Sequence, residues 1–172
     1  ALQRDLQQSS QDYTAEEWAA PFPPFQIDGG EVEVGLEDMQ ARFNLNNLID
    51  PQTGNANQDV ADQFRRLLEI LGLEAKWADL MVDWLDADLQ QTFPDGGEDP
   101  LYTTQTPPYL PPNGPITSTS ALLALPGFGI ERYRKSQPVV AALPVGTTIN
   151  VCTAPAEVLD SLSATLRQFD AN

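Results

Sequence analysis

Two stretches in the middle of the chain carry hydrophobic residues at the spacing of an amphipathic helix. Residues three or four apart lie on one helix face, and a glycine commonly follows the last turn. The first stretch ends before Gly72 and has apolar residues at Val60, Phe64, Leu67, Leu68 and Leu71. The second, residues 73–85, has them at Trp77, Leu80, Met81, Trp84 and Leu85. The pattern predicts two consecutive helices whose apolar faces form a core.

A different period marks residues 31–36, where charged and apolar residues alternate. Alternation with period two is typical of a half-buried antiparallel strand. We expect a turn at residues 37–40 and a short return strand at 41–45. A further short strand is expected at 147–151.

Other segments give weaker helical signals. We expect a helix end at residues 2–11 and helices at 121–125, 130–135 and 154–169, the last with Pro155 near its start. Residues 86–113 have no period and are acidic, then proline-rich. This segment is either an ordered or a disordered loop, and its length favours a functional role.

Composition narrows the possible functions of the chain. Its 172 residues include 25 acidic and 9 basic side chains, a formal net charge of −16, and no histidine. Anionic nucleic acids and membrane surfaces repel such a chain. Without histidine, imidazole catalysis and most zinc chemistry are excluded. No window approaches the length of a membrane span. The first residue is alanine, so we expect a processed chain or a fragment.

The densest acidic cluster is Asp83-Trp84-Leu85-Asp86-Ala87-Asp88, which is followed by an acidic run with a glycine pair, Asp95-Gly96-Gly97-Glu98-Asp99. Calcium takes six to eight oxygen ligands, often from flexible loops that contain glycine. We predict a calcium site here, with ligands at Asp86, Asp88, Glu98 and Asp99. The spacing does not match the helix–loop–helix calcium pattern. The alternative is a solvated acidic loop whose aspartates cap helix ends.

Three other features leave alternatives open. Residues 122–130 resemble a helix-hairpin-helix, which binds phosphate in some proteins, but a packing turn suits this acidic chain better. Paired carboxylates also suggest glycoside hydrolysis, although no acid is singled out. The lone Cys152 is either a small buried apolar group or the partner of a cysteine outside the chain.

Several motifs occur together in one order over residues 38–162. They are Asp38, residues 42–48 (Arg-Phe-Asn-Leu-Asn-Asn-Leu), 83–86, 97–99 with Tyr102, 107–109, 112–113, 143–144 and 149–151. The set resembles the K-type minor pseudopilins (GspK) of bacterial type II secretion. Cys152 departs from the family pattern, which usually has asparagine there.

The resemblance implies an α+β fold: a pilin-like scaffold, with an N-terminal helix on a small antiparallel sheet and a large inserted, mainly α-helical domain. We expect the pilin-like part at residues 1–44 and the insert at 45–148. Residues 149–172 would be a strand and either a second helical repeat or a return to the scaffold. The family implies calcium, which strengthens the prediction for the acidic loop.

The resemblance also implies a function without catalysis. Family members cap the tip of the periplasmic pseudopilus together with the I-type and J-type minor pseudopilins, and a membrane-spanning helix anchors them. The N-terminal segment is the expected partner surface, with Leu2 and Leu6 as its apolar contacts. The alternative from another class is a helix-hairpin-helix module that binds nucleic acid.

Overall fold

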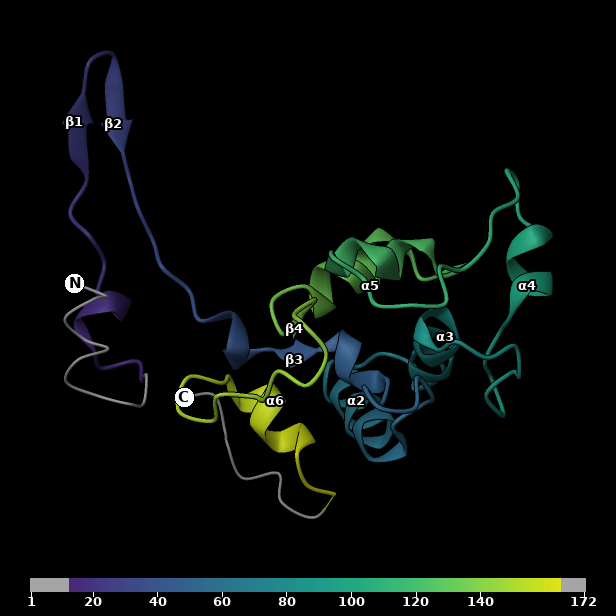
Figure 1. Cartoon of the computed structure of the whole chain (residues 1–172). Helices are drawn as coiled ribbons and strands as arrows, with labels where there is room; N and C mark the ends of the chain where they lie inside the picture. Colours follow the sequence, from purple (N-terminus) through teal and green to yellow (C-terminus); the bar gives the residue numbers. More distant parts are fainter. Residues whose placement is uncertain (1–12, 165–172) are drawn as a thin grey trace.

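A computed structural model of the chain describes residues 13–164. Near its start, η1 (Glu17–Ala19) is followed by an antiparallel hairpin of β1 (Phe25–Ile27) and β2 (Gly30–Val32), in which Phe25 pairs with Val32. The hairpin projects away from the rest of the molecule (Figure 1). The predicted helix at 2–11 lies outside the described residues.

The hairpin lies earlier in the chain than predicted. Its turn is at Asp28-Gly29, where Gly29 has φ +92°, a conformation that glycine adopts without strain. At the predicted turn, the Asp38 carboxylate accepts a hydrogen bond from Gln40 N at 2.8 Å and caps a short 3-10 helix, η2 (Met39–Ala41). The predicted strand at 31–36 is therefore wrong beyond Val32, because local capping at Asp38 leaves no hairpin turn there.

The return strand is also shorter than predicted and has another partner. β3 (Phe43–Asn44) pairs in parallel with β4 (Val140–Ala141), and both strands are buried. The short 3-10 helix η3 (Leu45–Leu48) follows β3 directly. Burial of Phe43 and Val140 in the same core explains why this strand pairs across the chain instead of with residues 31–36.

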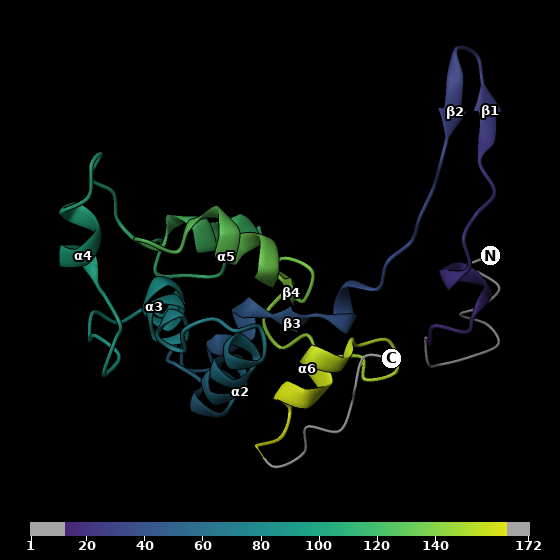
Figure 2. The ribbon, with the colours of Figure 1, turned by 180° about the vertical axis from the view of Figure 1, so that it is seen from behind.

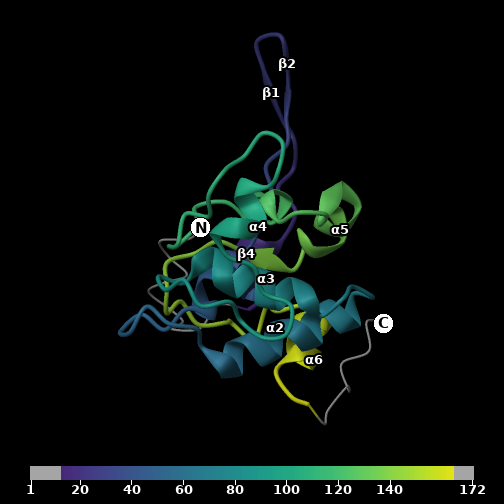
Figure 3. The same ribbon diagram turned by 90° about the vertical axis from the view of Figure 1, so that its right-hand side faces the viewer.

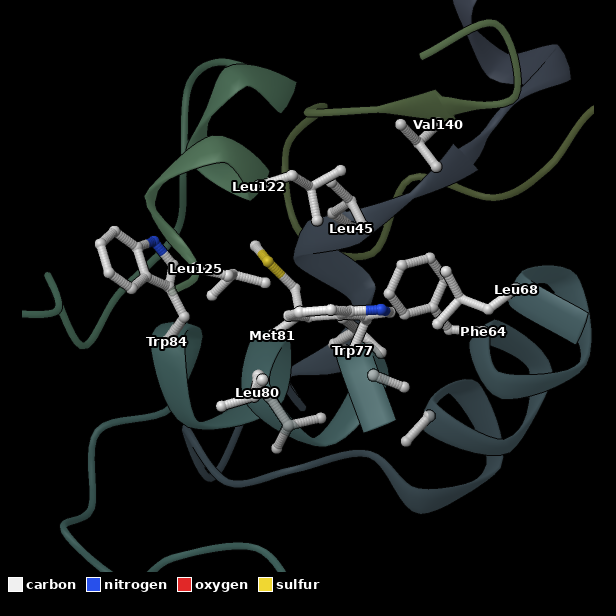
Figure 4. Packing of buried hydrophobic residues seen from close by; sticks show 14 of the residues in the cluster. Leu45, Phe64, Leu68, Trp77, Leu80, Met81, Trp84, Leu122, Leu125 and Val140 are labelled. Atoms are coloured by element: carbon white, nitrogen blue, oxygen red, sulfur yellow. The ribbon is translucent and has the colours of Figure 1, made fainter. Parts of the chain in front are cut away.

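The two helices predicted from the apolar spacing are confirmed. α2 (Gln58–Ile70) is capped by Asn57 and is followed by Gly72 at φ +67°, while α3 (Lys76–Leu85) follows at once. They pack against each other, and together with η3 they form the centre of the molecule (Figures 1 and 3). Figure 4 shows their apolar side chains meeting, with Trp77 and Met81 between Phe64 on one side and Leu125 on the other.

The rest of the body consists of short elements. These are α4 (Asp99–Thr103), the 3-10 helix η4 (Thr119–Ala124), α5 (Gly129–Ser136) and α6 (Ala156–Ser161). Residues 86–113 are thus not one irregular loop, since α4 interrupts them and buries Tyr102 completely. The segment predicted as a helix at 121–125 is a 3-10 helix.

The predicted strand at 147–151 is wrong. The Asn47 side chain holds this segment in a turn: its Nδ2 donates to Thr147 O at 2.7 Å, and its Oδ1 accepts from Gly146 N at 2.8 Å. The helix predicted at 154–169 is present as α6, which ends at Ser161. The end of that prediction lies outside the described residues.

α6 packs on α2, where Arg66 Nε donates to Ser161 O at 2.8 Å. Asn150 Nδ2 and Thr153 Oγ1 donate to the Asp38 carboxylate at 3.0 and 2.6 Å. The described part of residues 149–172 therefore packs against both the helical body and the segment that enters it. A strand followed by a helix, as predicted for this part, is replaced by a turn followed by α6.

The described residues form a mainly helical α+β chain with two small sheets, which confirms the predicted fold class. The hairpin lies at one end of the molecule and α4 at the other, as views from two sides show (Figures 1 and 2). Among the described helices, none has the length and apolar character to cross a membrane.

Candidate metal centre

The acidic segment leaves the end of α3 and returns at the start of α4. Asp86 is the C-cap residue of α3, and Glu98 precedes the first residue of α4, Asp99. Asp88 lies in the loop between them. Two helix ends and one loop therefore position the four residues that the sequence singled out as calcium ligands.

The structure brings three of those four residues together. One carboxylate oxygen from each of Asp86, Asp88 and Glu98 lies within 4.8 Å of the other two. Two ligands bound to one calcium ion at about 2.4 Å are separated by at most about 5 Å, so the three oxygens fit around one ion. Asp99 lies outside this triad, in the first turn of α4.

Two members of the triad are buried without a hydrogen-bond partner. Asp86 is 3% exposed and Glu98 is 8% exposed. Asp86 Oδ1 and both carboxylate oxygens of Glu98 accept no hydrogen bond. A buried ionised carboxylate without a donor costs several kcal/mol, so buried acids are normally paired or bound to a metal. The triad is thus incomplete without a cation or a proton.

The surroundings of the triad favour the protonated acids when no cation is present. Burial, then the charges of Asp88, Asp83 and Glu98, raise the pKa of Asp86 to about 7. Burial, then the charges of Asp83, Asp88 and Asp99, raise the pKa of Glu98 to about 7. Both shifts come from desolvation and from like charges, and a bound cation would oppose both.

Asp83 is a residue that sequence analysis counted in the acidic cluster but did not assign to the site. It is fully buried, and its two carboxylate oxygens accept from Thr92 N at 3.0 and 3.1 Å. Burial raises the pKa of Asp83, while the hydrogen bonds from Thr92 oppose that rise. Its role is to fix the loop. No apolar spacing in the sequence marks it, because the apolar face predicted for this helix has positions 77, 80, 81, 84 and 85.

The loop is closed by two further hydrogen bonds. Gly96 N donates to Thr92 O at 2.8 Å, and Gln91 Nε2 donates to Gly96 O at 2.6 Å. Asp88 also caps its own turn, since its Oδ1 accepts from Gln90 N at 2.7 Å. These contacts place Asp88 and Glu98 at the two ends of a short closed loop.

A cluster of aromatic side chains packs next to the acidic segment. The ring of Tyr102 lies 5.2 Å from that of Trp84 and 5.6 Å from that of Tyr109. Burial, then the charge of Asp83, raises the pKa of the Tyr102 hydroxyl, which has no hydrogen-bond partner. The aromatic group excludes water from the inner side of the acidic segment.

The donor set defines which ion suits the site. Carboxylate oxygens are hard ligands that favour calcium or magnesium, and the chain contains no histidine. Cys152, the single cysteine, is exposed, which shows that its interpretation as a buried apolar group is wrong. The alternative, a disulfide to a cysteine outside the chain, stays a prediction. Leu2 and Leu6 lie outside the described residues.

The hairpin-like segment at 126–129 is a turn that packs into the core. Phe128 is fully buried, and its ring meets the edge of Trp77 at 5.2 Å. Two of the three cations that follow are already engaged: Arg132 with Glu74 and Arg134 with Glu131. The geometry supports the packing role that the sequence favoured.

Comparisons with known proteins identify the family. The family model for type II secretion system protein K matches residues 41–145. Type II secretion system protein K of Pseudomonas aeruginosa is 37% identical over 94% of this chain, and that of Klebsiella pneumoniae is 37% identical over 88%. The chain covers 51% and 49% of these proteins, so it spans about half the length of the curated relatives it matches.

A solved structure supports the same conclusion. The match is to a chain in the crystal structure of the GspK–GspI–GspJ complex from the type II secretion system of enterotoxigenic Escherichia coli. The TM-score is 0.82 at 28% identity, and the match covers 94% of this chain and 60% of that chain. The sequence and the fold agree with the resemblance over almost the whole chain, and the chain belongs to the type II secretion system protein K family.

Proposed function

We propose that this chain is part of a minor pseudopilin that acts by assembly and carries out no catalysis. It would combine with the I-type and J-type minor pseudopilins at the tip of the periplasmic pseudopilus, cap the filament and support protein export. The observation that carries the proposal is its close match to a chain of the GspK–GspI–GspJ complex. An inner-membrane anchor in the complete protein is part of the proposal.

Assembly is tested by mixing the chain with I-type and J-type minor pseudopilins. We expect a 1:1:1 complex in size-exclusion chromatography with light scattering. The proposed partner surface predicts that Leu2→Glu with Leu6→Glu weakens assembly and leaves the melting temperature unchanged. Gln3→Glu with Gln7→Glu is the matched control, because it adds the same charges to the same segment.

Two results would contradict the assembly proposal. Separate elution of the three proteins at micromolar concentrations would oppose a complex. If the leucine variants assemble normally, Leu2 and Leu6 are not the contacts, and the interface lies on another part of the chain.

We further propose that the acidic triad holds a calcium ion. Three oxygens within reach of one ion, two of them from buried acids, are the support for this proposal. Asp86, Asp88 and Glu98 would provide carboxylate ligands, and Asp99 remains a candidate for a fourth. The ion would join the end of α3 to the start of α4 and hold the loop between them.

Calcium binding is tested by melting the chain in excess calcium and in chelator. We expect calcium to raise the melting temperature by several degrees, since a ligand that binds only the folded state stabilises it. Asp88→Asn with Glu98→Gln should abolish the rise, whereas Asp95→Asn should retain it. Loss of the rise in Asp99→Asn would add that residue to the ligand set. Equal melting curves in calcium and chelator would refute the site.

A further inference from the structure

The loop between α3 and α4 exposes the two most solvent-accessible large hydrophobic side chains among the described residues. Phe93 is 89% exposed and Leu89 is 66% exposed. Both lie within a few residues of the acidic triad. Large exposed apolar side chains are a common feature of protein interaction sites.

Hydrogen bonds hold the loop that carries these side chains. Thr92, the neighbour of Phe93, is bound through its backbone N–H to the fully buried carboxylate of Asp83. Thr92 O accepts from Gly96 N at 2.8 Å. Phe93 is therefore presented at the outside of a fixed turn, so a partner would order few groups on binding it, and the entropy cost would be small.

The same loop is strongly acidic. The sequence contains no lysine or arginine between Lys76 and Arg132. Asp95 is exposed and Asp99 is half-buried, and the described ion pairs include neither of them. Asp95 is not among the candidate calcium ligands, so an ion bound to the triad would leave its charge in place. Partners with anionic surfaces, such as membranes and nucleic acids, are therefore repelled.

The loop also lies far from the β1–β2 hairpin, at the α4 end of the molecule (Figures 1 and 2). We propose that Leu89, Phe93 and Asp95, here named the distal surface, dock a cationic segment of another protein that carries apolar side chains. Phe93 and Leu89 would bury the apolar side chains, and Asp95 would pair with lysine or arginine. The proposal depends neither on calcium nor on assembly with other pseudopilins.

The test uses labelled ten-residue peptides and the 172-residue chain, followed by fluorescence anisotropy. The peptides alternate lysine with leucine, lysine with serine, or glutamate with leucine. We expect the lysine–leucine peptide to bind at least tenfold more tightly than either of the others, in calcium as well as in chelator. Binding should weaken as salt rises, because the contact is partly electrostatic.

Paired variants assign the binding to the distal surface. Leu89→Ser with Phe93→Ser and, separately, Asp95→Asn should each weaken binding of the lysine–leucine peptide at least fivefold. The matched controls change the hairpin at the other end: Phe25→Ser with Ile27→Ser, and Asp28→Asn. Equal losses at both ends, or no preference for the lysine–leucine peptide, would overturn the proposal.

Discussion

Two regions of the molecule differ in the partners of their carboxylates: the helical body, built around α2 and α3, and the acidic segment, residues 86–99. In the body, the Asp79 carboxylate, which is 4% exposed, accepts from Arg65 Nη2 at 2.5 Å and from Arg65 Nε at 3.1 Å. The exposed Glu74 is paired with Arg132. Farther along the same helix, Asp86 is buried beside other acids and has no cationic partner among the described residues.

The difference shows which region neutralises its own carboxylates on folding. Asp79 and Glu74 each have a basic partner within the chain, so folding alone satisfies their charges. The acidic segment has no lysine or arginine of its own, and folding brings its carboxylates toward one another. Like charges that share a buried site must lose a charge or gain a counter-ion. The acidic segment thus requires a proton or a cation in a way that Asp79 and Glu74 do not.

The largest expected effect is an opposite dependence of stability on pH. Arg132 and Trp77 hold the pKa of Glu74 well below its usual range, so its contribution is present above pH about 4.5 and is lost as pH falls. Asp86 and Glu98 have pKa values raised to about 7, so the folded state binds their protons more tightly than the unfolded state. The stability that these two acids contribute to the folded state is present below pH about 4 and is lost as pH rises toward 7.

In chelator, this loss should reach several kcal/mol between pH 4 and pH 8. Urea unfolding at a series of pH values measures it. Calcium should remove most of the loss, because the ion stabilises the charged acids. Asp86→Asn with Glu98→Gln should flatten the chelator curve in the same way. A wild-type stability that rises from pH 5 to pH 7 in chelator would contradict the raised pKa values.

Sequence analysis predicted the helical body better than the segments at its ends. The spacing of apolar residues is sufficient to identify α2 and α3, because each helix buries one face. The hairpin was predicted too late in the chain, because the alternation of charged and apolar residues continues past Val32, where the strand pairing ends. Pairing of β3 with β4, almost a hundred residues away, leaves no local signal in the sequence.

The candidate site shows the same division between local and distant information. Glycines at 96 and 97 indicated that the chain returns toward Asp86, and three of the four predicted ligands do meet. What the sequence could not indicate is that Asp86 and Glu98 are buried, since that depends on α4 and Tyr102 closing over the loop. The roles of Asp83 and Thr92 depend on the same closure.

The next effect compares the loss of stability on truncating a buried aromatic side chain of the body with that on truncating an exposed one in the acidic segment. Trp84 is 7% exposed and packs against Tyr102 and Tyr109. Trp84→Ala should lower the free energy of unfolding by about 3–5 kcal/mol, because the cavity cannot close fully. Phe93→Ala in the acidic loop should change it by less than about 0.5 kcal/mol. Urea unfolding measures both, and a cost below about 1 kcal/mol for Trp84→Ala would show that its packing contributes little.

The smallest expected effect concerns the glycine that lets the loop close. A methyl group at Gly96 would lie 2.6 Å from Thr92 O and 2.9 Å from Thr92 N, while the same group at Gly30 in β2 meets nothing within 4 Å. Gly96→Ala must therefore displace the backbone that Asp83 holds, at a cost of about 1–3 kcal/mol. Gly30→Ala should leave the stability almost unchanged.

The Gly96→Ala variant should change calcium binding by the loop without changing the packing of the body. Because displacement moves Asp88 relative to Glu98, Gly96→Ala should weaken calcium binding at least fivefold in a calorimetric titration, and Gly30→Ala should not. The core around Trp77 and Phe64 lies in other elements, so near-ultraviolet circular dichroism of the folded Gly96→Ala variant should keep its tryptophan bands. Unchanged calcium affinity in Gly96→Ala would mean that closure of the loop does not position the triad, and a lost near-ultraviolet spectrum would mean that body and loop fold as one unit.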